Sequence, residues 1–227
     1  ESLTPIIRDY SQISAKLKEL SGIEFLPNVV NSQKIDIKTG TIENVSDLSF
    51  STMDNSGQVI CTENRIDCVF NFDIDHQEGI EDKFNIASEI IQFIMKKAKV
   101  FANRLALNVT CLSNICNGNS VFEKQVMYVG PFYKNKTIKE WSSRTNARGM
   151  MSINGIEESL NIITEYTYAT EQTTKETRII CHTDINTIPE NKDFRFESDS
   201  IAIFKKQARS IFLEIQDDLE GLIQDEK

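Results

Sequence analysis

The sequence predicts an α+β fold, with two pseudo-repeated halves of mainly antiparallel sheet covered by long amphipathic helices. The first observation is a strand in which apolar and polar residues alternate, and it occurs twice, at Arg65–Asp75 and Arg178–Ile185. The second is that a polar linker and then an apolar helical stripe follow each strand, at Ile80–Phe101 and Ser200–Leu222. We therefore expect the second half to repeat the first.

The domain prediction is one compact unit, residues 1–227, with halves that cover approximately 23–112 and 121–227. The chain has 4 prolines and no Pro/Gly-rich stretch that would serve as a flexible hinge. A chain of this size buries roughly 70% of its unfolded surface, which suffices for a hydrophobic core without disulfides. A hydrophobic content of 40% and a charged content of 26% are typical of a folded globular protein.

The elements of the first half follow from local signals. Apolar residues at helical spacing predict a helix over Thr4–Leu20, which Gly22 would cap. Phe25–Lys38 is predicted to be irregular or a strand. The sequence Asp54-Asn55-Ser56-Gly57 has the composition of a hairpin turn between strands at Leu48–Met53 and Gln58–Thr62.

The strand Arg65–Asp75 has the clearest alternation in the chain, so one of its faces should be buried and the other polar. The helix that follows has acidic residues in its first turn and lysines in its last, as the helix dipole favours. Leu105–Leu112 is predicted to return as a strand.

The second half begins with Val121–Val129, which is consistent with either a strand or a short helix. Pro131–Asn154 has no convincing period and is predicted to be a long loop or cover segment. Leu160–Ala169 and Thr177–Ile185 are predicted to form a second hairpin. The last helix then presents a broad apolar face to the sheet.

The outline resembles a sporadically distributed group of uncharacterised bacterial proteins. The resemblance covers the larger part of the chain, and its motifs are the strand Asn64–Asp75, the sequence Arg104-Leu105-Ala106-Leu107 after the first long helix, and the strand end Thr183-Asp184-Ile185-Asn186 with its closing helix. The resemblance implies the fold and a bacterial source. It implies no activity for any residue.

Composition limits the possible functions. The net charge of −9 repels phosphate backbones, so double-stranded nucleic acid is a disfavoured partner. The 5 cysteines show no metal-binding spacing, and buried reduced thiols in a cytoplasmic protein are the simplest interpretation. No apolar stretch reaches the roughly 18 residues of a membrane span, so we expect no membrane partner. No glycine-rich phosphate motif is present, and no cofactor is expected.

One segment differs from this acidic background, because Phe132–Arg148 is basic and carries the only tryptophan. Tryptophan and arginine are enriched in binding hot spots. The segment could grip an acidic protein, a small anionic or phosphorylated ligand, or single-stranded nucleic acid. In the simpler interpretation Trp141 anchors a long loop to the core while the cations are solvated. The candidate partner-binding residues are Tyr133, Lys134, Lys136, Lys139, Trp141, Arg144 and Arg148.

The favoured function is therefore a non-enzymatic binding or assembly protein that engages a protein or anionic partner through this segment. The helices could also form a homo-oligomer through their apolar faces.

The alternative is a metal-dependent hydrolase with a His/Asp site at the strand ends. The chain has 2 histidines, and each has a carboxylate nearby. The candidate ligands are His76, Asp75, His182 and Asp184. Cys181 cannot act with His182 as a nucleophile–base pair, because neighbours on a strand point to opposite faces. No catalytic motif supports an enzyme, so this alternative is the less favoured one.

Overall fold

The computed structural model describes residues 10–35, 37–71, 77–113, 116, 136, 140–170 and 173–224. The chain divides into two compact units. The first unit comprises Glu1–Asn103 and Asp193–Lys205, and the second comprises Arg104–Lys192 and Lys206–Lys227. Residues 104–112 belong to the second unit and Asp193–Lys205 to the first, and the expected single compact unit with its two halves stays a prediction.

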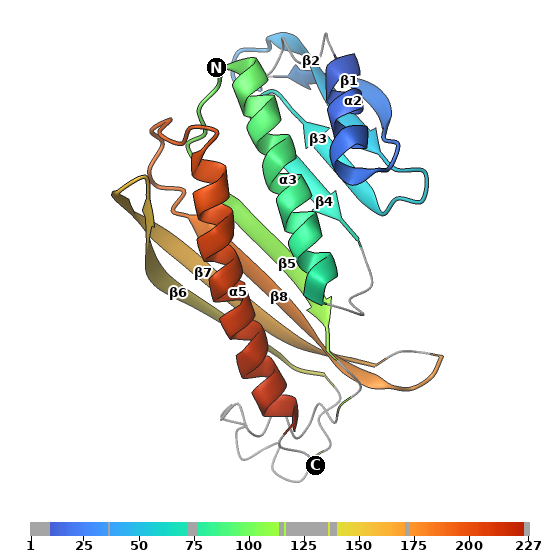
Figure 1. Ribbon diagram of the computed structural model, residues 1–227, viewed down its shortest axis with the longest axis vertical. Coiled ribbons are helices and arrows are strands. Elements are labelled where there is room, and N and C mark those ends of the chain that lie inside the picture. The colour runs from blue at the N-terminus through green and yellow to red at the C-terminus, as the bar shows by residue number, and fades with distance from the viewer. Residues whose placement is uncertain are drawn as a thin grey trace. The chain divides into compact units, whose positions relative to one another are not determined.

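The first unit contains a four-stranded antiparallel sheet in the order β1-β2-β3-β4 (Figure 1). Its strands are β1 (Leu26–Ile35), β2 (Ile42–Ser51), β3 (Gly57–Cys61) and β4 (Ile66–Phe70). The predicted turn between β2 and β3 is confirmed. Asp54 Oδ1 closes this turn by accepting hydrogen bonds from the Ser56 backbone N–H at 3.0 Å and the Ser56 hydroxyl at 2.8 Å.

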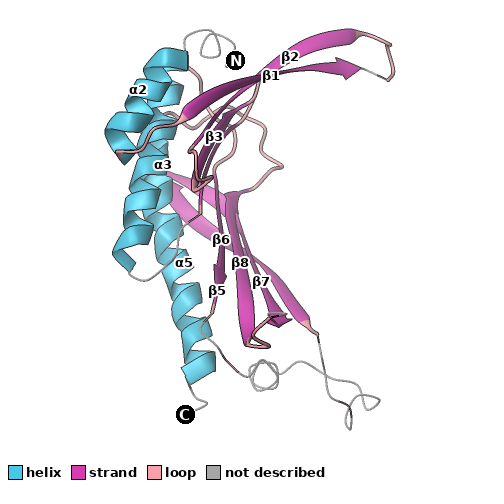
Figure 2. Ribbon diagram, turned by 90° about the vertical axis from the view of Figure 1, so that its right-hand side faces the viewer, coloured by secondary structure: helices cyan, strands magenta, loops and turns pink. Residues whose placement is uncertain are grey.

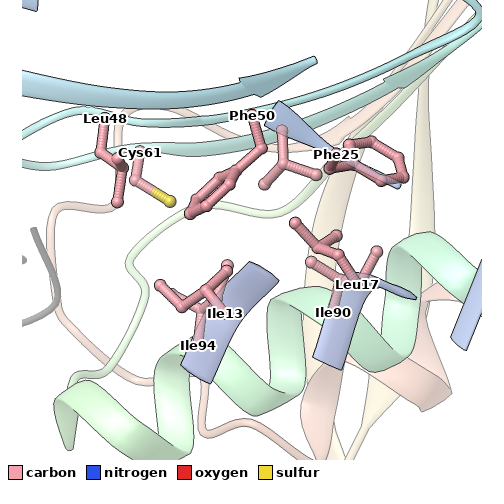
Figure 3. Close-up of a cluster of buried hydrophobic side chains, with 9 residues drawn as sticks. Ile13, Leu17, Phe25, Leu48, Phe50, Cys61, Ile90 and Ile94 are labelled. Atoms are coloured by element: carbon pink, nitrogen blue, oxygen red, sulfur yellow. The ribbon is translucent and has the colours of Figure 1, made fainter. Parts of the chain in front are cut away.

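Two helices of the first unit, α2 (Tyr10–Ser21) and α3 (Gln77–Ala98), contribute to its core. Their apolar side chains meet those of the sheet in one buried cluster (Figure 3). The cluster consists of Ile13, Leu17, Phe25, Leu48, Phe50, Val59, Cys61, Ile90 and Ile94. Gly22 ends α2 as predicted, since its φ is +69° and its N–H donates to the Lys18 carbonyl at 3.0 Å.

The second unit contains a four-stranded antiparallel sheet in the order β5-β8-β7-β6. Its strands are β5 (Ala106–Leu112), β6 (Ser142–Ile153), β7 (Ile156–Thr170) and β8 (Thr177–Thr187). The predicted β7–β8 hairpin is confirmed. Because β5 also pairs with β8, β8 lies inside the sheet with a neighbour on each side.

The helix α5 (Ser200–Gln224) lies along one face of this sheet (Figure 2). The helix and the sheet bury an apolar cluster between them. Trp141 belongs to this cluster and stacks on Tyr168, with ring centroids 6.4 Å apart and planes inclined by 10°. The other buried members are Cys111, Cys116, Ile179, Cys181 and Leu219.

The prediction of a loop over Pro131–Asn154 is wrong for its second part, because Ser142–Ile153 forms β6. The error has a physical reason. β6 is an edge strand, and from Arg144 to Arg148 its side chains are exposed on both faces of the sheet. Such a strand shows no alternation of apolar and polar residues. The turn Asn154-Gly155 after β6 has φ values of +53° and +80°, as a type I′ hairpin turn requires.

The α+β class with antiparallel sheets is confirmed, with α2, α3 and α5 as the helices of the described ranges. The pseudo-repeat and the amphipathic role of the helices stay predictions. The predicted helix Thr4–Leu20 is described from Tyr10, and Val121–Val129 lies outside the described residues. None of the described helices is both long enough and apolar enough to cross a membrane.

Candidate binding surface on the second sheet

The second sheet has one face that α5 covers and one that no described helix of its unit covers (Figure 2). The alternation along β8 assigns residues to each face. Cys181, Thr183 and Ile185 are buried on the side of α5, whereas His182 and Asp184 are half-buried on the other side. We call the second side the uncovered face. It carries the even-numbered residues of β5, β6 and β8 and their odd-numbered partners on β7.

Polar side chains form a row across all four strands of the uncovered face. The register pairs Thr110 of β5 with His182 of β8. It then pairs His182 with Glu165 of β7, and Glu165 with Arg144 of β6. The Thr110 hydroxyl and His182 Nδ1 are 2.9 Å apart and share a hydrogen bond. Glu165 lies between His182 and Arg144, so the row combines an imidazole, a carboxylate and a guanidinium group.

A second polar chain on this face runs from Asp184 to Asn161. Asn186 Nδ2 donates to Asp184 Oδ1 at 2.8 Å, and Asn161 Nδ2 donates to Asn186 Oδ1 at 3.3 Å. Both asparagines are buried, and Asn161 Oδ1 has no hydrogen-bond partner within the described ranges. This chain of hydrogen bonds links the carboxylate of Asp184 to Asn161, which lies opposite Arg148 of β6.

The Arg148 side chain lies at one end of the uncovered face, opposite Asn161. Its Nη2 donates to Glu190 Oε1 at 3.2 Å, and both side chains are more than half exposed. A hydrogen bond from its own backbone and the Arg148 guanidinium hold the pKa of Glu190 below its usual range. The two residues line an open hollow of about 610 Å³ together with Gly149, Met150, Ser159 and Ile188.

The outer edge of β6 is free of any other described strand. The N–H of Tyr168 in β7 donates to the Trp141 carbonyl at 3.2 Å. Because hydrogen-bonded pairs alternate along an antiparallel ladder, the odd-numbered residues of β6 are the ones whose backbone groups bond to β7. The backbone N–H and C=O groups of the even-numbered residues therefore point outward, away from the sheet. One of them is occupied, because Gln207 Nε2 of α5 donates to the Ser152 carbonyl at 2.6 Å. The outward groups from Ser142 to Met150 have no such partner in the described part of the chain.

The structure places only some of the predicted partner-binding residues. Arg144 and Arg148 are exposed on the uncovered face of β6, and Lys136 is exposed. Trp141 is 8% exposed and belongs to the core of the second unit, where its ring faces Tyr168 and not solvent. Tyr133, Lys134 and Lys139 lie outside the described residues. The binding role of the set stays a prediction.

The predicted metal ligands are also placed in part. His182 and Asp184 share the uncovered face of β8, two positions apart, whereas Asp75 and His76 lie outside the described residues. Within the described ranges no group of three or more His, Cys, Asp or Glu side chains could hold a metal ion. A site there would need ligands from other parts of the chain.

The buried thiols belong to the opposite face of this sheet. Cys181 lies directly across from Cys111, and the amide of Gln216 bridges them: Cys111 Sγ donates to its Oε1 at 3.2 Å, and its Nε2 donates to Cys181 Sγ at 3.5 Å. The interaction between the two neighbouring thiols lowers the pKa of Cys181 and raises that of Cys111. As expected, the alternation along β8 puts Cys181 and His182 on opposite faces, so they cannot act together.

Two residues of this surface escaped the sequence analysis. Glu165 and Glu190 lie far from Arg144 and Arg148 in the chain, and only the β6–β7 register and the end of β8 bring them close. A local signal for β6 was present, because Asn-Gly between apolar runs predicts a two-residue hairpin. Applied at Asn154-Gly155, it would have identified the edge strand.

Comparison with known proteins adds no identity to this surface, since no protein-family model, no curated protein and no solved structure matches the chain. The resemblance to a group of bacterial proteins therefore stays a prediction.

Proposed function

We propose that the protein is a binding or assembly protein, and that its second unit captures an extended, acidic segment of a protein partner along the free edge of β6. The observation that carries the proposal is the combination of an unpaired strand edge with two arginines on one side of it. An extended segment that adds to a sheet edge gains main-chain hydrogen bonds, and its side chains meet those of the edge strand.

The edge has the length and regularity that strand addition requires. β6 and β7 pair over 12 consecutive positions, from Ser142 to Ile153, without a bulge. Natural sheets commonly block an exposed edge with proline, a bulge or a very short strand. β6 has none of these, and its outward N–H and C=O groups from Ser142 to Met150 have no partner among the described residues.

The charges of the edge favour an acidic partner. Arg144 and Arg148 both extend from β6 on the uncovered face, and Arg144 has no ion pair within the described residues. A carboxylate on the added strand, directly opposite either arginine, would form a favourable cross-strand pair. The same arginines oppose pairing of β6 with a second copy, because antiparallel pairing about Asn146 would place each Arg144 opposite the other copy's Arg148. The partner is therefore a different, acidic segment.

The first test is binding of a fluorescent 12-residue peptide with two glutamates among threonines and valines, followed by anisotropy. Replacing Arg144 with Glu should weaken binding roughly tenfold, because an attractive cross-strand pair becomes a repulsive one. Lys206→Glu makes the same charge change at an exposed position of α5 and should leave the affinity unchanged. If both variants lost the same affinity for the peptide, the binding would reflect only the general attraction between charges and not a site at β6.

The second test separates strand addition from simple charge attraction. The N–H of Asn146 points outward, so Asn146→Pro removes a donor from the edge without breaking a bond to β7. Binding should fall roughly fivefold, whereas Asn146→Ala, which keeps the N–H, should bind like the wild type. If the proline variant is folded and binds the peptide normally, the partner does not add to this edge.

A further inference from the structure

We infer that Glu190 is an internal competitor: in the free protein its carboxylate occupies the position at Arg148 that a carboxylate of the partner takes in the complex. The inference rests on the proposed function, and it concerns how the same edge selects and regulates its partner. Its starting point is that the two arginines of the edge differ. Arg148 contacts a carboxylate at 3.2 Å, whereas Arg144 has none within the described residues.

The Arg148–Glu190 contact has the properties of an exchangeable one. The Arg148 side chain is 57% exposed and that of Glu190 is 62% exposed. Water screens such a pair on both sides, so replacing one carboxylate with another changes little in solvation. Glu190 lies in the turn after β8, 42 positions from Arg148, and is not part of the strand ladder. Its carboxylate can leave without breaking a backbone hydrogen bond of the sheet.

The hollow at this end of the sheet provides the space for the exchange. It holds about 610 Å³ and is lined by both members of the ion pair and by the apolar side chains of Met150 and Ile188. An acidic side chain of a strand added to β6 would enter it beside Met150, which is 60% exposed. The aliphatic part of a glutamate would contact the thioether while its carboxylate replaced that of Glu190.

The spacing of the arginines then defines the partner. On a strand, side chains four positions apart share a face, so the residues opposite Arg144 and Arg148 are also four apart. The partner segment should carry acidic residues at positions i and i+4 of an extended stretch. Its intervening residues meet Thr145 and Ala147, which are small and exposed on the other face of β6, so apolar β-branched residues fit there.

The experiment is a cycle of variants read by the anisotropy of the two-glutamate peptide. Glu190→Gln should tighten binding about twofold to fivefold, the range expected for removal of an exposed ion pair. The gain should disappear in an Arg148→Gln background and persist in an Arg144→Gln background. Glu220→Gln removes an equal charge from an exposed position of α5 and should not change the affinity.

The outcomes separate this inference from the proposed function. If the wild type binds the peptide and Glu190→Gln binds it no more tightly, Glu190 does not compete and only the further inference fails. If Glu190→Gln tightens binding equally with and without Arg148, the effect is one of net charge and the inference is also overturned. If neither the wild type nor any variant binds acidic peptides, the proposed function itself is wrong.

Discussion

In the described part of the chain the two sheets have the same number of strands and the same antiparallel pairing, but they differ at their edges. In the first sheet all neighbours are consecutive in the chain, and the edge strands are β1, which contains Pro27, and the short β4. In the second sheet β5 pairs with β8, which leaves β6 as a long edge without proline. Proline and short length are common protections of an edge. Among the described strands, β6 is therefore the long edge strand that has no proline, and its edge protection is limited to the charges of Arg144 and Arg148.

The comparison also separates two strands that look alike in the sequence. The alternating strands at Arg65–Asp75 and Arg178–Ile185 were both expected to lie before a helix in equivalent places. The described part of the first, β4, lies at an edge, whereas β8 is flanked by β5 and β7. Alternation along a strand determines which face is buried, but it does not determine the neighbours of that strand.

The largest expected effect contrasts the core of the first sheet with the edge of the second. Phe50 is fully buried among the side chains of α2 and α3, so Phe50→Ala should lower the free energy of unfolding by about 3–5 kcal/mol. Thr145 is exposed on β6, and Thr145→Ala should stay within about 0.5 kcal/mol of the wild type. Urea denaturation followed by circular dichroism measures both. A large loss in Thr145→Ala would mean that the β6 edge is packed against something.

A smaller effect is expected at the turn that fixes the register of the free edge. Gly155 has a φ of +80°, so Gly155→Ala should destabilise the second sheet by about 1–2 kcal/mol. Gly221 lies in α5 with open space around its Cα, and Gly221→Ala should stabilise the protein by up to about 1 kcal/mol. The same denaturation experiment compares them. A destabilising Gly155→Ala beside a stabilising Gly221→Ala would confirm a left-handed turn between β6 and β7, and a stabilising Gly155→Ala would contradict it.

The smallest effect concerns the corresponding turn of the first sheet. Hydrogen bonds from Thr52 and Ser56 lower the pKa of Asp54 from 3.8 to about 2. Because the folded-state pKa is the lower one, the stabilisation is present above pH 4 and is lost as the pH falls toward 2. The stability difference between wild type and Asp54→Asn should therefore shrink across this window. A difference that does not depend on pH would show that the Asp54 carboxylate is not held by these donors.

How much the sequence could reveal depended on burial. The β7–β8 hairpin was predicted from the alternation of buried and polar side chains along its strands, and α5 from its apolar helical stripe. The β2–β3 turn was predicted from the composition of Asp54-Asn55-Ser56-Gly57. β6 was missed because its middle residues are exposed on both faces, so no hydrophobic period marks it. The pairing of β5 with β8 was not accessible either, since no local signal reports a contact across 70 positions.

For the candidate site, too, the sequence indicated some residues and not others. The contrast between the basic Phe132–Arg148 segment and the acidic chain pointed to Arg144 and Arg148. The contrast could not show that Trp141 is stacked in the core, nor that Glu190 meets Arg148, because both facts depend on tertiary packing. Charge patterns can thus indicate a binding surface, whereas the geometry of that surface has to come from the structure.

The most direct test of the central claim is amide hydrogen exchange along β6, measured by NMR with and without the two-glutamate peptide. In the free protein the amides of odd-numbered residues from Ser143 to Met151 should exchange slowly, and those of even-numbered residues from Ser142 to Met150 should exchange fast. Bound peptide should protect the even-numbered amides and leave the odd-numbered ones unchanged. If the peptide binds and the even-numbered amides still exchange fast, no partner strand is added to β6, and the proposed strand addition is wrong.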